Sequence, residues 1–273
     1  MFIYFDNKKD FIKFWEFSKK SILEIESNIK NEIIIFNSFN KLYDNLRTDD
    51  GGRLGLNNHL RNGLVDSLGL CGRQRHLALV IKDNINLSGI NHHIFESNTP
   101  LSDLLKNKFN FSVSSYWTSK ERPSYLDSSV MFLDLLNLDL RDNFYDTFVH
   151  SDCLEHIFDY KKSLSECLIK LRPGGKLIFS VPFFAMPNTN VRARYINSEL
   201  VLLQDAEWHG DVGNQGPILT FYNFGLDLFD QIREIGFSKV MIAYCHNPLL
   251  GLFSDNHPDW FWRMPPISII AIK

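Results

Sequence analysis

The feature that most constrains the fold is an alternation of strands and a helix between Val130 and Pro182. Its elements are a strand, a second strand, a helix and a third strand, at 130–133, 144–150, 154–171 and 176–181. Proline cannot extend a helix and glycine tolerates a left-handed backbone, so Pro173 and Gly174 are expected to end the helix. Strands that alternate with helices predict a mostly parallel sheet covered on both faces.

The same alternation continues on both sides of this segment. The pattern predicts further strands at 91–95, 111–115, 239–244 and 266–272, and further helices at 99–109 and 226–235. The period of the apolar residues separates the two kinds of element, since it is near 2 in strands and near 3.6 in helices. The sequence therefore predicts an α/β domain over most of its length.

The N-terminal part of the chain has a helical pattern. Apolar residues at helical spacing predict an amphipathic helix over 8–48, and a second helix is expected over 58–84. The first helix either packs on the domain or forms a lid over the site. Because 48–55 is rich in turn-forming residues, we expect a helical extension over 1–56 and one domain over 57–273.

Composition excludes several classes of partner. The 273 residues carry a formal net charge of −3, which offers no general attraction to nucleic acid. No apolar run approaches the roughly 18–20 residues that span a bilayer, and the first residues do not follow a secretory-signal pattern. Four cysteines without a Cys-x-x-Cys pair predict neither a metal site nor a disulfide framework, and favour a cytoplasmic protein.

Five short motifs occur in order in the central segment: Asp134, Phe144-Tyr145-Asp146, Leu154-Glu155-His156, Leu171-Arg172-Pro173-Gly174-Gly175 and Pro182. Their order and spacing resemble the central half of the class I S-adenosylmethionine (SAM)-dependent methyltransferases of the small-molecule type. A stretch at 207–229 resembles a segment that covers the acceptor pocket in uncharacterised bacterial methyltransferases. The resemblance implies a Rossmann-like, doubly wound, mostly parallel seven-stranded sheet with an antiparallel last strand, here with an N-terminal helical extension. It also implies SAM as cofactor.

The resemblance implies roles for residues at the carboxyl ends of the strands, where open parallel sheets bind ligands. Asp134 is expected to accept a hydrogen bond from the adenine amino group, and the backbone amide of Leu135 to meet a ring nitrogen. Ser151 and Asp152 are expected to flank the methyl-donor side.

Two departures from the family pattern concern the cofactor. The usual Gly-x-Gly-x-Gly loop is replaced by the glycine-free segment 93–101. There Glu96 either binds the cofactor's ammonium group or is a solvated residue, and Thr99 either borders the cofactor or caps the next helix. The acid that would hold the ribose is also missing: Ser114-Ser115-Tyr116 stands in its place, and Glu121 substitutes only if the loop folds back.

Methyl transfer is an in-line displacement that needs alignment and, for some acceptors, a base. Candidate bases near the strand ends are Asp152, His156, His209 and Asp211. His209-Gly210-Asp211 is the most informative set, because an imidazole is ordinarily a competent base near neutral pH. An Asp–His hydrogen bond that merely holds the loop is the alternative, and His156 is either a site residue or a structural one.

The predicted function is methyl transfer from SAM to an oxygen or nitrogen of a small-molecule or sugar acceptor. The alternative is a catalytically degenerate binding protein of the same fold that works with glycan biosynthesis enzymes. Arg73 and Arg75 either bind an anionic acceptor or are surface or core-edge cations. Five aromatic residues line the acceptor pocket or belong to the core: Phe183, Phe184, Trp208, Phe221 and Tyr222.

Overall fold

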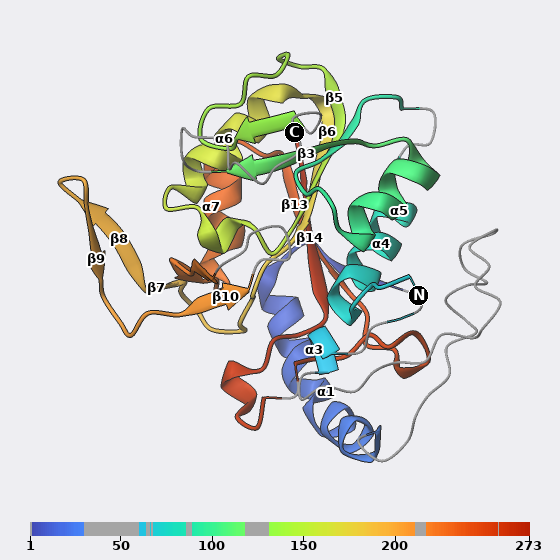
Figure 1. Cartoon of the computed structure of the whole chain (residues 1–273). Helices are drawn as coiled ribbons and strands as arrows, with labels where there is room; N and C mark the ends of the chain where they lie inside the picture. Colours follow the sequence, from blue (N-terminus) through green and yellow to red (C-terminus); the bar gives the residue numbers. More distant parts are fainter. Residues whose placement is uncertain are drawn as a thin grey trace.

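An eight-stranded sheet forms the centre of the computed structural model (Figure 1). The structure describes residues 2–29, 60–63, 66, 68–85, 89–117, 131–210, 217–255 and 257–273. In spatial order the strands are β1 (Ile3–Phe5), β13 (Lys239–Tyr244), β14 (Ile267–Ile272), β6 (Leu171–Ser180), β5 (Tyr145–Ser151), β2 (His92–Ile94), β3 (Ser112–Trp117) and β4 (Met131–Asp134).

The strand directions confirm the expected doubly wound sheet. β4, β3, β2, β5 and β6 pair in parallel, and β14 runs antiparallel between β6 and β13. These seven strands are the predicted ones, and the last strand is the antiparallel one. β1 adds an eighth, antiparallel to β13 at the edge, which the sequence did not predict. From β2 the chain moves outward to β3 and β4 and then returns to β5 on the other side, so a ligand crevice is expected beyond β2 and β5.

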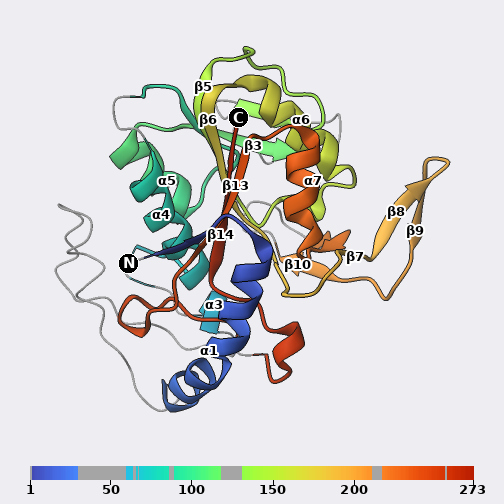
Figure 2. The same ribbon diagram turned by 180° about the vertical axis from the view of Figure 1, so that it is seen from behind.

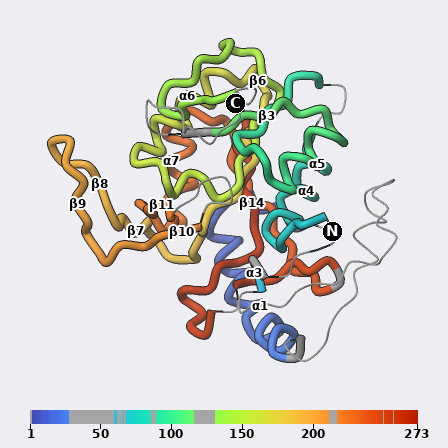
Figure 3. Tube along the Cα trace, in the orientation of Figure 1, coloured from blue at the N-terminus to red at the C-terminus, as the bar shows by residue number. Residues whose placement is uncertain are grey.

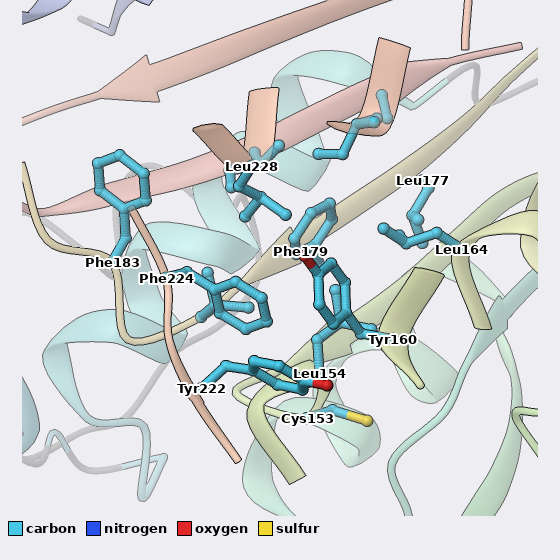
Figure 4. Packing of buried hydrophobic residues seen from close by; sticks show 14 of the residues in the cluster. Cys153, Leu154, Tyr160, Leu164, Leu177, Phe179, Phe183, Tyr222, Phe224 and Leu228 are labelled. Atoms are coloured by element: carbon cyan, nitrogen blue, oxygen red, sulfur yellow. The ribbon is translucent and has the colours of Figure 1, made fainter. Parts of the chain in front are cut away.

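Helices cover both faces of the sheet, as Figures 1 and 2 show. α4 (Gly72–Asn84) and α5 (Pro100–Phe109) lie on one face, and α6 (Tyr160–Lys170) and α7 (Asp227–Ile235) on the other. On the second face, Leu177 and Phe179 of β6 pack among Tyr160, Leu164 and Leu228 of the two helices (Figure 4). Burial of apolar surface on both faces is what fixes this layered arrangement.

The N-terminal helix α1 (Lys8–Ile29) packs on the core. Phe11, Trp15 and Ile22 point inward and are buried, and Trp15 stacks on Trp260 with ring centroids 4.2 Å apart. The spacing of these residues follows the predicted amphipathic face. The rest of the helix expected over 8–48, the expected hinge and the expected boundary after residue 56 lie outside the described residues.

The helix predicted over 58–84 is wrong as a single element. α3 (Leu60–Gly63) and α4 are separated by a turn in which the Asp66 carboxylate accepts the amides of Leu68 and Leu70 at 2.9 and 3.0 Å. α4 then starts after Cys71, whose amide donates to the Gln74 side chain at 3.2 Å. An acid that satisfies two backbone donors in a turn competes directly with helix continuation.

The helix predicted over 154–171 is also divided. The chain forms a short 3₁₀ turn, η1 (Leu154–His156), before α6 begins. The Asp159 side chain caps α6 by accepting the amide of Lys162 at 3.1 Å, which the apolar spacing alone does not reveal. The helix ends at Lys170, one residue before its expected end, but Pro173 and Gly174 do not terminate it directly: they lie in β6, which begins at Leu171 and not at 176, and there Gly174 has a left-handed φ of 76°.

Between β6 and α7 the chain forms short two-stranded sheets that the sequence did not predict. They contain β7 (Asn190–Val191), β8 (Ala193–Ile196), β9 (Glu199–Leu202), β10 (Trp208–Gly210), β11 (Pro217–Leu219) and β12 (Tyr222–Asn223). β8 and β9 form a hairpin that projects from the body of the protein (Figure 3). Two further 3₁₀ turns, η2 (Pro248–Leu250) and η3 (Trp260–Trp262), precede β14.

Candidate active site

A pocket of about 370 Å³ opens beyond the carboxyl ends of β5 and β6. Its wall is formed by the turn after β5, by η1, by the segment after β6 and by β10, and α3 and the first turn of α4 close one side. Because β5 borders the point where the strand order reverses, the pocket lies beside the crevice expected to bind a ligand.

Asp152 follows β5 and is held by two arginines. Its Oδ2 lies 3.2 Å from Arg61 Nη1 and 3.2 Å from Arg73 Nε, while its Oδ1 accepts from Arg61 Nη2 at 3.3 Å and from Ser180 Oγ at 2.7 Å. Burial alone would raise the pKa of this carboxyl, but the two guanidinium groups outweigh burial and lower it. Asp152 is therefore a fixed anion rather than a proton acceptor.

Arg73 also contacts the second residue expected on the donor side. Its Nη1 donates to the hydroxyl of Ser151 at 2.6 Å. The sequence left Arg73 either as an anion-binding residue or as a surface cation, and the structure places it in the pocket wall. Arg75 is instead buried, and donates to the backbone carbonyls of Leu70 and Gly251 at 2.7 and 2.9 Å. It is a core-edge cation that holds loops together.

Glu155 is a pocket residue that the sequence did not single out. Its side chain is 0% exposed, and in the described part of the chain neither carboxylate oxygen has a hydrogen-bond partner. Burial and the nearby negative charge of Asp152 raise the pKa of Glu155 well above its ordinary value. The available signal was its place in Leu154-Glu155-His156, which the sequence interpretation treated as a marker of the fold.

The structure brings His156 and His209 together at Glu155. The two imidazole rings meet edge to face with centroids 5.1 Å apart. His156 Nε2 lies 3.7 Å, and His209 Nδ1 3.9 Å, from Oε1 of Glu155. Sequence reasoning named both histidines as candidates, but they are far apart in the chain and only the fold could pair them.

Each imidazole is oriented through its other nitrogen. His156 Nδ1 lies 2.9 Å from the carbonyl oxygen of Leu219, so this nitrogen carries the proton and Nε2 carries the lone pair. His209 Nε2 lies 2.9 Å from Glu207 Oε1, which directs the Nδ1 lone pair toward Glu155. Glu207 is in turn held by Arg192, whose Nε lies 3.2 Å from its Oε2.

The remaining predicted pocket residues divide into two groups. Phe184 and Trp208 line the pocket. Phe183, Phe221 and Tyr222 belong to the buried core instead. Asp211, the fourth candidate base, lies outside the described residues.

The residues expected to hold adenine are at the end of β4. Leu136 donates its amide to Asp134 Oδ1 at 2.8 Å, which fixes the carboxylate at the start of the following turn. Among the described residues, Asp134 Oδ2 has no hydrogen-bond partner, while the side chain of Leu135 is buried. One fixed carboxylate oxygen that remains able to accept a hydrogen bond fits the adenine amino group of SAM.

In the glycine-free loop after β2, an asparagine adopts the backbone conformation that turns the chain. Asn98 has a left-handed φ of 57°, a conformation that asparagine tolerates better than most residues. Thr99 caps α5 by accepting the amide of Ser102 at 3.2 Å, as one of its two predicted roles required. Glu96 is half-buried, and its negative charge adds to the larger effect of Asp152 in raising the pKa of the Arg73 guanidinium against the effect of burial. The loop thus places an acid beside the crevice, in keeping with an ammonium ligand. Glu121, the substitute for the ribose acid, lies outside the described residues.

The comparisons with known proteins agree with this geometry. Residues 104–179 match the family model of a methyltransferase domain. A search of curated proteins found no match.

Several solved methyltransferase structures resemble the chain weakly. Phosphoethanolamine N-methyltransferase 2 of Haemonchus contortus, in complex with S-adenosyl-L-methionine, is 16% identical over 73% of this chain and 52% of that chain, with a TM-score of 0.44. An S-adenosylmethionine-dependent methyltransferase of Mesorhizobium loti is 14% identical over 72% and 98%, with a TM-score of 0.41. The 1,6-didemethyltoxoflavin-N1-methyltransferase of Burkholderia thailandensis is 14% identical over 74% and 78%, with a TM-score of 0.41.

The chain spans about half the length of the Haemonchus contortus protein. Among the helices that the structure describes, none is both long and apolar enough to cross a membrane. Residues 104–179 thus match a methyltransferase domain, and they lie in a sheet with the strand order and directions described above, so this segment of the chain resembles the class I SAM-dependent methyltransferases.

Proposed function

We propose that this enzyme methylates an oxygen or nitrogen atom of a small polar acceptor, such as a sugar, bound in the pocket beyond β5 and β6. The observation that carries the proposal is the pair His156 and His209, two oriented imidazoles that line the pocket and meet at Glu155 beside the expected cofactor crevice. An imidazole nitrogen can orient an acceptor hydroxyl or amine and receive its proton.

On the cofactor side, we assign Asp134 and the backbone amide of Leu135 to adenine and Glu96 to the ammonium group. Ser151 borders the donor side, and Thr99 supports the loop from the start of α5. SAM supplies an electrophilic methyl group on a sulfonium centre. The protein's own contribution is alignment, because methyl transfer needs no covalent nucleophile.

Asp152 is better suited to positioning than to proton transfer. Its ion pairs with Arg61 and Arg73 keep it charged. They also fix Arg73, whose guanidinium donates a hydrogen bond to Ser151 and so holds that side chain in place. We therefore assign proton transfer to the histidines and assign Asp152 to holding the wall between the two ligand sites.

The lining supports a polar acceptor. Charged groups of both signs reach the pocket, and Trp208 leaves 55% of its surface exposed at its edge. An exposed indole offers an apolar face on which a sugar ring can lie, while the charged groups bind hydroxyls.

Calorimetry and a turnover assay test the function together. SAM is titrated into the wild-type protein and into Asp134→Ala, and methyl transfer to a panel of sugars and small alcohols and amines is followed by release of the demethylated product. Loss of one hydrogen bond between a charged and a neutral group predicts about 10- to 100-fold weaker SAM binding in Asp134→Ala. The matched control is Asp139→Ala, an exposed acid in the same loop, which should bind SAM normally. No SAM binding at millimolar concentration would exclude the activity.

A non-catalytic binding protein of the same fold is the second candidate, favoured by one observation. Arg73 reaches across from α4 to Ser151 and Asp152, so the groups expected at the methyl-donor side already have a cationic partner. SAM binding without turnover on any acceptor of the panel would favour this alternative, with glycan biosynthesis enzymes as the expected partners.

The state of the cysteines bears on the compartment. All four are buried and none forms a disulfide. Unpaired thiols are typical of reducing compartments, which supports the cytoplasm as the site of action.

A further inference from the structure

We propose that Glu155, His156 and His209 form a binding site for one divalent transition-metal ion at the floor of the pocket. One ligand atom from each residue lies within 4.8 Å of the other two. The proposal concerns the apo chain and can be tested without cofactor or acceptor.

The two histidines are prepared as ligands. In metal-binding imidazoles the N–H of the second nitrogen characteristically donates a hydrogen bond to a carbonyl or carboxylate, which fixes the ring and makes the other nitrogen more basic. His156 meets this requirement through the Leu219 carbonyl at 2.9 Å, and His209 through Glu207 at 2.9 Å. The outer partners thus come in the two forms typical of metal sites.

Glu155 supplies the negative charge. A carboxylate that is 0% exposed, with neither oxygen hydrogen-bonded among the described residues, is costly to bury as an anion. A divalent cation would remove this cost. Asp152, an acid of the same pocket, is already neutralised by Arg61 and Arg73, whereas the buried charge of Glu155 has no such partner at ion-pair distance among the described arginines and lysines.

The distances suit an ion with short bonds. Two metal–ligand bonds of about 2.1 Å span at most about 4.2 Å. The separations of 3.7 and 3.9 Å between the imidazole nitrogens and Glu155 Oε1 lie within this span. Small side-chain rotations complete the site.

The ligand types select the ion. Two imidazoles and one carboxylate favour zinc, manganese, iron or cobalt over magnesium, which prefers oxygen ligands. Three protein ligands also leave positions open toward the pocket. This last step rests on the proposed function: an acceptor oxygen would occupy one of the open coordination positions. The histidines would then act as metal ligands rather than as bases.

The test is a titration of the full-length, chelator-treated protein with CoCl₂, followed by the visible absorption of bound cobalt, with ZnCl₂ in competition by calorimetry. We expect one equivalent to bind, and Glu155→Gln and His209→Ala each to weaken binding at least about tenfold. Glu207→Gln removes no ligand but should weaken binding by about 10-fold or more, as outer partners do. The matched control is His257→Gln, an exposed histidine outside the pocket, which should bind like wild type.

Three results would overturn the proposal: no saturable binding by the wild type, equal affinity in both ligand variants and the wild type, or an equal loss in His257→Gln. Thermal melting identifies any variant that does not fold, and His209→Ala, on the partly exposed strand β10, then stands in for the buried Glu155→Gln. SAM titrations of the same proteins separate the two hypotheses. A protein that binds SAM normally but binds no metal would contradict the metal site alone. A protein that binds metal normally but does not bind SAM would contradict the proposed function alone.

Discussion

Glu26, near the end of α1, forms a buried ion pair with Arg263, in the segment between η3 and β14. The same carboxylate accepts the amide of Ser254 at 2.8 Å and lies 3.0 Å from His246 Nε2. Burial would raise the pKa of Glu26, but the bonds from His246 and Ser254 outweigh burial and lower it. One side chain of the N-terminal helix thus organises the connection between the last two strands.

Glu26→Ala should therefore destabilise the protein by about 3–5 kcal/mol, because it leaves the buried Arg263 without its counter-charge. The free energy of unfolding in urea measures the effect. Asp142→Ala is the matched control, since it removes an ion pair with Lys170 in which the aspartate is 61% exposed. Its cost should stay below about 1 kcal/mol. Equal costs for the two variants would contradict the organising role of Glu26.

Asp152 and Arg61 should be energetically coupled. In a double-mutant cycle of Asp152→Asn and Arg61→Met, the cost of the double variant should fall short of the sum of the single costs by about 0.5–3 kcal/mol. Asp152→Asn should also slow methyl transfer, because Arg73 loses the partner that holds it against Ser151. Additive stability costs would show that the ion pair at 3.2 Å contributes nothing.

The central α/β segment could be predicted from sequence because its signals are local. A few neighbouring residues are enough to predict each of three features. These are the strand before Asp134, the strand before Ser151 and the end of the helix ahead of Pro173-Gly174. β1 could not be predicted in this way. Its three residues gain stability only by pairing with β13, more than two hundred positions away in the chain, and no local pattern encodes that partner.

The candidate site divides in the same way. His156 and His209 were named from their types and places, but Glu155 was passed over. Glu155 is recognisable as a site residue only from its contacts with two histidines and from its place in a 3₁₀ turn, which replaces the start of the expected helix. The interruption depends on the Asp159 cap, which outweighs a regular apolar spacing over 154–171. Tertiary proximity and competing side-chain bonds to the backbone are what the sequence pattern omits.

Trp208 should contribute to acceptor binding and not to cofactor binding. It lies at the edge of the pocket with 55% of its surface exposed, so its removal costs little stability. Trp208→Ala is expected to raise the acceptor KM by about fivefold, since stacking on an aromatic ring contributes on the order of 1 kcal/mol. SAM affinity should be unchanged. Phe261→Ala, an exposed aromatic outside the pocket, is the control, and an equal KM change there would count against the role of Trp208.

Acid should destabilise the protein through buried neutral histidines. Burial lowers the pKa of His93 from 6.5 to about 4, with Ser112 and Ser114 hydroxyls 2.7 and 2.8 Å from its two nitrogens. Between these values the unfolded chain binds the proton and the folded chain does not, so stability is full above pH 6.5 and falls as the pH drops toward 4. His93 alone accounts for roughly 3 kcal/mol. Urea unfolding from pH 7 to 4 should give a shallower loss in His93→Gln. An unchanged slope would contradict the assignment.

The two glycines after α6 should differ in their tolerance of a side chain. Gly174 has a left-handed φ of 76°, but nothing lies within 4 Å of the position that a Cβ would take, so Gly174→Ala costs only the backbone strain of about 1–2 kcal/mol. At Gly175 a Cβ would lie 2.8 Å from the Arg172 carbonyl oxygen and 2.9 Å from that of Tyr145. Both contacts are with backbone, where β6 joins β5, so the strands must separate. Gly175→Ala should therefore lower the melting temperature more than Gly174→Ala. If Gly174→Ala lowered the melting temperature more, the left-handed backbone at Gly174 would matter more for stability than the close approach of the two strands at Gly175.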